Sequence, residues 1–380
     1  MRDLQGQKRI RAAEEMLSHL KTGKLEPRFS VGVWYFYPPG GRFHAPYIEK
    51  GTIKDILGKI GWMKDEGYID SNFGIEAHYP NEVNRENLDL YLDFEKETGI
   101  RLITAIPNLF YDAAYEFGSL SNPDPKIREH AIERLEESLH LNKELGTEFA
   151  VIWPGIDGYE NPFGFDFYGM WERFEEGLAK AMDAVPGVRV AIEPKPYEPR
   201  GNNIYRNTAN GLLMTRDVEA RLEAEENKQL LDEGRALVTL NPEVGHVLMG
   251  HEELAYALAS ILREGRLAHT HWNSQPLGNF DQDLNVGVLG IDQMLASMLV
   301  LKMHGYEDFL GIDINPERIP VERALVLSMN SVRTACAMVD GLDVERLVEA
   351  MFNPSENRGV VEDVLTKVLA RGLLELKPLP

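Results

Sequence analysis

The 380-residue sequence predicts a (β/α)8 TIM barrel, and three observations support this prediction. Short runs rich in β-branched and aromatic residues recur along the chain, segments with helical apolar spacing separate them, and about 285 residues hold eight such units. Strands that alternate with helices form a parallel sheet, and eight of them close into a barrel.

Each expected strand is followed by a segment of helical periodicity. In the segment 127–145, for example, Ile132, Leu135 and Leu139 recur at the spacing of one helical face. A helix is also expected before the first strand, at residues 8–21. The expected strands, in chain order, span residues 29–34, 73–78, 101–106, 148–153, 188–193, 236–241, 267–272 and 308–313.

The expected barrel domain, residues 29–340, lies between an N-terminal helical segment, 1–28, and a C-terminal helical arm, 341–380. No Gly/Ser linker, low-complexity tract or break in composition marks a second domain. The arm has apolar periodicity, yet it is too short to bury a core of its own. We therefore expect it to pack on the barrel or on a neighbouring subunit.

The composition is that of a soluble globular protein, with 43% hydrophobic and 27% charged residues. A net charge of −21 would repel a phosphate backbone, and no Lys/Arg cluster forms a basic face, so nucleic acid is not an expected partner. No apolar run of roughly 18 residues predicts a membrane span, and the charged amino terminus does not resemble a signal peptide. The single cysteine, Cys336, has apolar neighbours and is expected to be buried. These features predict a cytoplasmic protein.

The carboxyl ends of the strands, where such barrels carry their functional side chains, are unusually polar and aromatic in this sequence. Each residue has an ordinary structural interpretation when taken singly, as a helix cap, a hydrogen-bonded histidine or a core aromatic. In chain order these residues are Trp34, His78, Asn108, Phe110, Trp153, Glu193, Lys195, Asn241, Glu243, His246, His271, Asn273, Asp281, Asp283 and Asp313.

The five carboxylates and three histidines of this set would repel one another and pay a large desolvation cost unless cations neutralise them. The set therefore predicts bound divalent metal. Its ligands are mostly oxygen with some imidazole and no nearby thiolate, which favours Mg²⁺, Mn²⁺ or Co²⁺. Glu243 and His246 fit one metal or a bridge between two. Asp281 and Asp283 are two residues apart, so both carboxylates turn to one side of an extended segment.

Several runs of sequence match a known family in order and spacing across residues 29–315. The chain resembles the D-xylose isomerase family of metal-dependent aldose–ketose isomerases. The most specific matches are the run 191–201, which contains Glu193-Pro194-Lys195, and the run Asn241-Pro242-Glu243-Val244-Gly245-His246. The other matches are 29–34, 108–110, Asn273 with Gln275, and 281–284.

The resemblance implies two divalent cations per subunit. It assigns Glu193, Glu243, His271 and Asp313 to the first ion, and it assigns Glu243, His246, Asp281 and Asp283 to the second, with Glu243 bridging. It also implies that Lys195 binds the sugar O1 and that His78 assists ring opening. The implied substrate contacts are Trp34, Phe110, Trp153, Asn273 and Phe43, of which Phe43 would enter the site of a neighbouring subunit in a homotetramer, with a homodimer as the alternative.

Three positions depart from the xylose isomerase pattern. Xylose isomerases carry Asp at the positions of His271 and Asn81, and Lys at the position of Asn315. A histidine at the first of these positions resembles L-rhamnose isomerases, as does the run 309–313. Asn81 cannot serve as the anionic partner of His78, so ring opening needs another explanation.

The expected function is therefore an aldose–ketose isomerase that moves a hydride between C1 and C2 of an open-chain sugar. The first choice of substrate is D-xylose with D-xylulose, or D-glucose with D-fructose. The alternatives within the superfamily are an L-rhamnose isomerase-like or other aldose isomerase and a sugar epimerase. A metal-dependent endonuclease conflicts with the acidic charge, and a sugar-binding protein would usually be exported.

Overall fold

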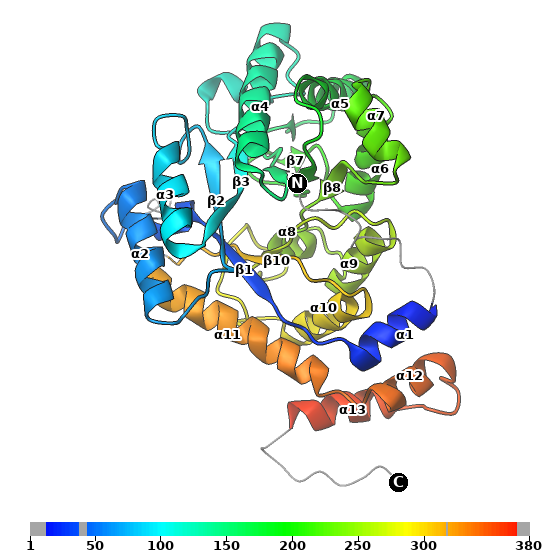
Figure 1. Cartoon of the computed structure of the whole chain (residues 1–380). Helices are drawn as coiled ribbons and strands as arrows, with labels where there is room; N and C mark the ends of the chain where they lie inside the picture. Colours follow the sequence, from blue (N-terminus) through cyan, green and yellow to red (C-terminus); the bar gives the residue numbers. More distant parts are fainter. Residues whose placement is uncertain (1–12, 38–43, 317, 371–380) are drawn as a thin grey trace.

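The computed structural model describes residues 13–37, 44–316 and 318–370, in which parallel strands line the centre and helices surround them (Figure 1). All eight expected runs contain or overlap a strand of this wall, so the predicted barrel is confirmed. The wall strands are β1 (Arg28–Gly32), β2 (Gly74–Tyr79), β3 (Arg101–Pro107), β4 (Ala150–Ile152), β6 (Val190–Ile192), β8 (Val238–Leu240), β9 (His271–Trp272) and β10 (Phe309–Ile312).

The wall consists of two parallel ladders that meet at both sides. One ladder has the order β3-β2-β1-β10-β9 and the other β4-β6-β8. Parallel bridges between Leu240 and Leu267 and between Glu243 and His271 join β8 to the β9 side. On the opposite side, the backbone N–H of Glu148 donates to the carbonyl of Ile103 at 3.2 Å. Outside the wall, β5 (Gly158–Tyr159) pairs antiparallel with β7 (Asn202–Asn203).

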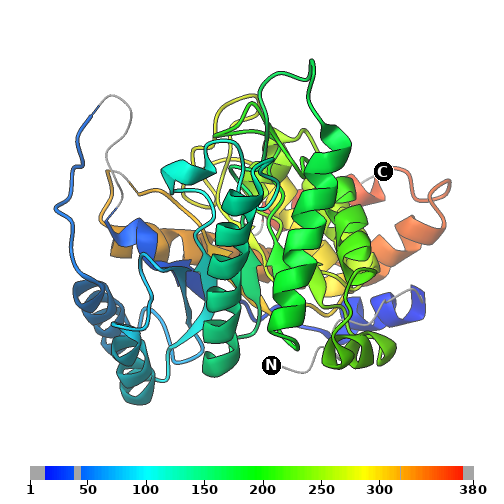
Figure 2. The same cartoon turned by 90° about the horizontal axis from the view of Figure 1, so that it is seen from above.

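Helices follow the strands around the outside of the barrel, as Figure 2 shows from a second direction. The helix after β3 illustrates how the sequence sets an element: Asp124 caps its first turn, proline occupies its first position, and Gly146 ends it in the left-handed conformation at φ 61°. The helices are α1 (Ala13–Thr22), η2 (Val33–Phe36), α2 (Ile53–Asp65), α3 (Leu88–Thr98), η3 (Ala113–Tyr115), α4 (Pro125–Leu145), α5 (Phe167–Ala184), α6 (Thr208–Glu219), α7 (Glu225–Asp232), α8 (Val244–Met249), α9 (Leu254–Arg263), α10 (Ile291–Met303), α11 (Val321–Asp340), α12 (Val344–Phe352) and α13 (Val360–Leu369).

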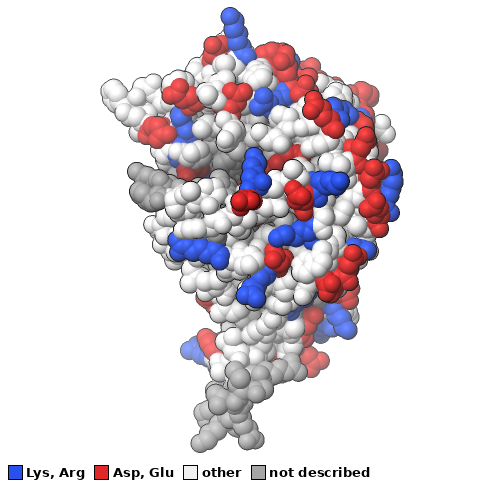
Figure 3. Space-filling model, turned by 90° about the vertical axis from the view of Figure 1, so that its left-hand side faces the viewer, with Lys and Arg blue, Asp and Glu red and all other residues white. Residues whose placement is uncertain are grey.

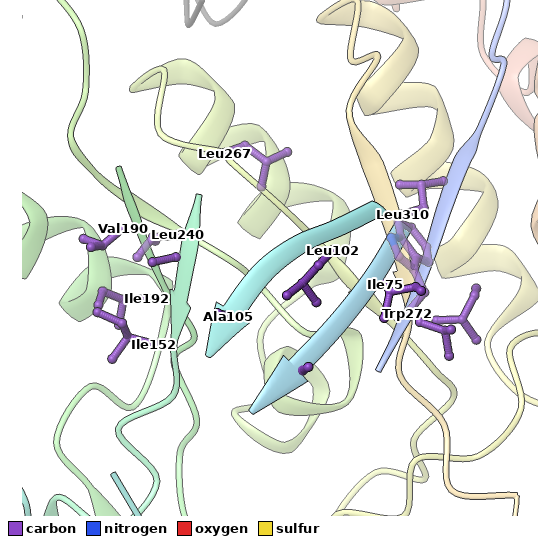
Figure 4. Packing of buried hydrophobic residues seen from close by; sticks show 14 of the residues in the cluster. Ile75, Leu102, Ala105, Ile152, Val190, Ile192, Leu240, Leu267, Trp272 and Leu310 are labelled. Carbon is purple, nitrogen blue, oxygen red and sulfur yellow. The ribbon is translucent and has the colours of Figure 1, made fainter. Parts of the chain in front are cut away.

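Alternate strand residues divide the apolar core into two layers. Ile152, Ile192 and Leu240 point outward and pack against the helices, in the cluster that Figure 4 shows from close by. Their strand neighbours, such as Val151 and Ala191, belong to a separate cluster that fills part of the barrel interior. The carboxyl ends of the strands stay free of this filling, and the polar side chains gather there.

The expected N-terminal helix appears as α1, with residues 1–12 outside the described part. α12 and α13 lie beside one another near α1, outside the ring of barrel helices (Figure 1). Arg346 on α12 donates to the Asp363 carboxylate on α13 at 2.6 Å. Cys336 is buried in α11, as expected.

Two surface features bear on possible partners. None of the described helices is both long and apolar enough to cross a membrane. On the face that Figure 3 shows, acidic and basic side chains are interspersed and no continuous basic area is visible.

Candidate active site

A cavity of about 980 Å³ opens at the carboxyl ends of the barrel strands. It brings together most of the residues that the sequence pattern selected, although they come from segments far apart along the chain. The selected residues that line it are Trp34, His78, Asn108, Phe110, Trp153, Glu193, Lys195, Glu243, His246, His271, Asp281, Asp283 and Asp313.

Four buried side chains form a first cluster of potential metal ligands: Glu193, Glu243, His271 and Asp313. The Nδ1 atom of His271 lies 2.9 Å from Oε2 of Glu193 and 2.9 Å from Oδ2 of Asp313. The extended backbone places these groups, because the N–H of Glu193 donates to the Ile152 carbonyl and the N–H of Asp313 to the Trp272 carbonyl. The ladder thus continues one residue past the strands and holds the ligands in register.

A second cluster consists of Glu243, His246 and Asp281, and it shares Glu243 with the first. Glu243 is the residue before α8, so His246 falls within the first turn and its Nε2 lies 3.0 Å from Oε2 of Glu243. The same nitrogen is 3.2 Å from Oδ2 of Asp281. Gly245 leaves the room for this turn, since a Cβ there would lie 2.9 Å from Oε1 of Glu243.

Asp283 lies next to the second cluster but does not belong to either group of converging ligand atoms among the described residues. Its backbone is left-handed, with φ 45°, and its Oδ1 accepts a hydrogen bond from the Asn273 amide at 3.0 Å. Asn273 also donates to Oε1 of Glu243 at 2.8 Å. Asn273 therefore supports both carboxylates, and its expected contact with substrate stays a prediction.

The charges of the site fit a divalent cation. Burial, together with the nearby carboxylates of Asp281 and Asp283, raises the pKa of Glu243 well above its usual range. Burial raises the pKa of Asp313 to about 7. Oδ1 of Asp281, Oδ1 of Asp313 and Nδ1 of His246 are buried and have no hydrogen-bond partner in the described part of the chain. A bound cation would both neutralise the carboxylates and satisfy such atoms.

Two buried residues near the site, Glu76 and His269, were not among those selected from the sequence. Glu76, on β2, accepts hydrogen bonds from His269 and from His271 at 3.0 Å each. Burial lowers the pKa of His271, but the carboxylates of Glu76 and Glu193 dominate and raise it to about 10. The spacing of Glu76 two residues before His78 was the available signal, because such residues face the same side of a strand.

Glu82 supplies the anionic partner that Asn81 cannot provide for His78. Nδ1 of His78 lies 3.1 Å from Oε2 of Glu82, and the backbone N–H of His78 donates to the same oxygen at 2.8 Å. Asn81 instead accepts from the Asn108 amide at 2.7 Å. Asn81 and Glu82 both line the cavity, so the anionic partner of His78 is still within the site but comes from the next residue in the chain.

Aromatic rings form one wall of the cavity. The rings of Trp34 and His78 are 4.3 Å apart, and Phe110 follows at 5.5 Å from His78 and 4.7 Å from Trp153. Lys195 lies at the end of this row, with its ammonium 5.2 Å from the Trp153 ring and 2.8 Å from Oδ2 of Asp281. Phe43, the remaining expected substrate contact, lies outside the described residues.

Comparison with known proteins places this geometry in a family context. Residues 68–335 match the xylose isomerase-like TIM barrel family. A xylose isomerase from Thermus thermophilus is 34% identical over 296 residues, which are 75% of this chain and 71% of that protein. A xylose isomerase from Thermus caldophilus is 33% identical over 215 residues, or 56% of this chain and 52% of that protein.

Solved structures with the same fold are more distant in sequence. A D-tagatose 3-epimerase-like protein matches with a TM-score of 0.61 and 14% identity over 83% of this chain and 98% of that one. An L-ribulose 3-epimerase matches with a TM-score of 0.54 and 16% identity over 93% of this chain and all of that one. At such identities these likenesses concern the fold alone.

Proposed function

This chain belongs to the xylose isomerase-like TIM barrel family, and we propose from this premise that it is a divalent-metal-dependent aldose–ketose isomerase acting on a small sugar in the cytoplasm. The observation that carries the proposal is the pair of ligand clusters that share Glu243 beside a buried lysine. An isomerase needs groups that bind two neighbouring sugar oxygens and a cation at the carbonyl oxygen.

The ligand sets of the proposal follow the clusters. Glu193, Glu243, His271 and Asp313 would hold one ion, while Glu243, His246 and Asp281 would hold a second, with Asp283 completing it. Bound divalent ions polarise neighbouring hydroxyl and carbonyl oxygens and lower the pKa of a bound water. The ligand side chains would determine where the ions act on the sugar, because the two clusters lie together at one end of the cavity.

Lys195 would hydrogen-bond the sugar O1 and stabilise the charge that develops there. The residue is 5% exposed, and it lines the cavity between the Trp153 ring and the Asp281 carboxylate. Burial works against the charged form, but Asp281 and Glu243 outweigh it and raise the pKa of Lys195, so the ammonium stays protonated.

His78 would assist ring opening at the ring-oxygen end of the sugar, accepting the proton of the anomeric hydroxyl and returning a proton to the ring oxygen as its bond to C1 breaks. Because Nδ1 of His78 donates to Glu82, the neutral ring carries its proton there and leaves Nε2 as the acceptor. Glu82 would stabilise the imidazolium that forms. Trp34 and Phe110, which flank the imidazole, would exclude water from the reacting carbons.

D-xylose is the first candidate substrate, with D-glucose next. An L-rhamnose isomerase-like substrate is the second candidate, because His271 resembles the histidine of L-rhamnose isomerases. The imidazole in place of a carboxylate also shifts the metal preference of the first site toward Mn²⁺ or Co²⁺. A sugar epimerase is the nearest rival, but a second cluster and Lys195 have no evident task in proton exchange at one carbon. We also propose a homotetramer, with a homodimer as the alternative, which light scattering would distinguish.

The test is a panel of aldopentoses, aldohexoses and 6-deoxyhexoses incubated with the metal-free protein and with Mg²⁺, Mn²⁺ or Co²⁺ added singly. Products are identified by NMR, which separates a ketose from an epimer of the starting sugar. The proposal expects a ketose that forms only with metal. An epimer as the sole product, or equal turnover in excess chelator, would overturn it.

A further inference from the structure

A buried carboxylate lies inside the barrel, directly beneath the first ligand cluster. Glu76 is 1% exposed, and its strand β2 pairs with β1 and β3. Its Oε1 accepts from the Ser30 hydroxyl at 2.7 Å and from Nε2 of His269 at 3.0 Å. Its Oε2 accepts from Nε2 of His271 at 3.0 Å. Its donors are therefore Ser30 on β1, His271 on β9 and His269 just before β9.

The backbone leaves space for this arrangement at one position of β10. A Cβ on Gly311 would lie 2.8 Å from Nε2 of His269, 2.8 Å from Cδ2 of His271 and 3.0 Å from Oε1 of Glu76. Gly311 is in an ordinary strand, so close approach and not backbone conformation is the reason for glycine here. The carboxylate and its two imidazoles thus occupy a space that an alanine would disturb.

The hydrogen bonds fix which nitrogen of each ring carries a proton. Oε1 of Glu76 accepts from the Ser30 hydroxyl and from the His269 ring, and Oε2 accepts from the His271 ring, so each carboxylate oxygen acts as an acceptor. Both Nε2 atoms must then donate. Nδ1 of His269 has no partner among the described residues, and Nδ1 of His271 faces Glu193 and Asp313.

We propose that Glu76 is the positioning residue of the first metal site: it holds the proton of His271 on Nε2 and aims the Nδ1 lone pair at the ion. This inference rests on the proposed function, since it concerns the same ligands. Carboxylates behind a metal-bound histidine orient the ring and raise its basicity. In xylose isomerases a carboxylate stands at the position of His271. In this chain the imidazole takes that position, and the Glu76 carboxylate lies behind it in the barrel interior.

The same three residues, Glu76, His269 and His271, converge closely enough to suggest a separate cation site. Hydrogen bonds from the two Nε2 atoms to Glu76 account for these contacts without an ion. An ion there would also need both nitrogens of His271 to act as ligands at once. The positioning role needs no additional ion and only one nitrogen of His271 as a ligand.

The test measures metal affinity of the apoprotein, without substrate. Co²⁺ is titrated against a chromogenic chelator, and its visible absorption reports the ligand set. Glu76→Gln is expected to weaken one of the two binding steps by about 10- to 100-fold and leave the other unchanged. Gly311→Ala, which keeps the carboxylate but crowds it, is expected to weaken the same step. Asp157→Asn changes another fully buried carboxylate, which accepts from Ser119 and Ser121, and should leave both steps as they are.

A double-mutant cycle separates positioning from general stability. His271→Asp alone should bind the ion poorly, because the new carboxylate would lie in the barrel interior close to Glu76. Adding Glu76→Gln to His271→Asp should improve binding, whereas the same change in the natural chain impairs it.

Three outcomes of this cycle are informative. Unchanged Co²⁺ affinity in Glu76→Gln, or an equal loss in both backgrounds, would overturn the inference. A natural chain that binds no Co²⁺ would instead contradict the proposed function.

Discussion

Lys195→Met is the substitution whose consequences the structure defines most fully. The lysine is 5% exposed, and its ammonium lies 2.8 Å from Oδ2 of Asp281 and 3.9 Å from Oε2 of Glu198. Methionine keeps most of the side-chain volume but removes the cation. The change therefore tests two separate functions of one group: charge balance in the metal-free protein and stabilisation of the sugar O1 during turnover.

Both effects have estimable sizes. Removing one partner of a buried ion pair costs about 3–5 kcal/mol of unfolding free energy, and the metal-free variant should lose stability on that scale. With divalent metal bound, Asp281 has another cation beside it and the loss should be much smaller. The turnover number should fall by about 10²- to 10³-fold, the cost of one donor to a developing oxyanion.

The assay compares denaturant unfolding in chelator and in Mn²⁺ with ketose formation under the same conditions. Lys302→Met is the matched control, because Lys302 is also a buried lysine, paired with Asp340 at 2.5 Å outside the cavity. The control should lose stability equally with and without metal and keep its turnover. Near-normal turnover of Lys195→Met, or a stability loss that metal does not reduce, would refute the reasoning.

Three further outcomes follow from the geometry. Glu243→Gln should lower the metal stoichiometry by more than one ion and abolish turnover, because both clusters contain Glu243; retention of two ions by inductively coupled plasma analysis would argue against sharing. Glu82→Gln should slow turnover at the ring-opening step, so a pre-opened sugar should rescue it, whereas Asn81→Gln should not slow that step. Equal rates for Glu82→Gln and the natural chain would show that Glu82 does not assist His78. Burial raises the pKa of Cys336 to about 12, so a thiol reagent at pH 8 should label it only after unfolding, and fast labelling of the native protein would be inconsistent with its burial.

The barrel could be predicted because its signal is local and repeated. The runs around Val31, Ile192 and Ile312 are short and apolar, and each ends on a residue that the strand direction carries to the same rim. The gathering of carboxylates at that rim followed from topology alone, without knowledge of any side-chain contact. That is why the residues lining the cavity could be selected from strand ends.

For Glu76 the sequence offered only its spacing from His78 and no sign of its partners, because those partners are distant in sequence. It lies 193 residues from His269 and 195 from His271, and no spacing rule connects them. Glu82 was missed for a different reason. The chain after β2 turns back so that the N–H groups of Glu82 and Val83 both donate to the His78 carbonyl, which brings the carboxylate under the imidazole.

The expected effect of His271→Asp also changes once the structure is known. The resemblance to xylose isomerases, taken alone, implies that Asp at this position restores their ligand set. With Glu76 at 3.0 Å from the imidazole, the substitution places two carboxylates together in the barrel interior. It is therefore expected to succeed only together with Glu76→Gln.

The most direct test of the central claim follows deuterium from C2 of the substrate. The best aldose of the panel, labelled with deuterium at C2, is converted in ordinary water with Mn²⁺, and the ketose is examined by NMR. A hydride shift between C1 and C2 predicts that the deuterium appears at C1 of the ketose. Deuterium lost to solvent, or an epimeric aldose in place of the ketose, would contradict the account.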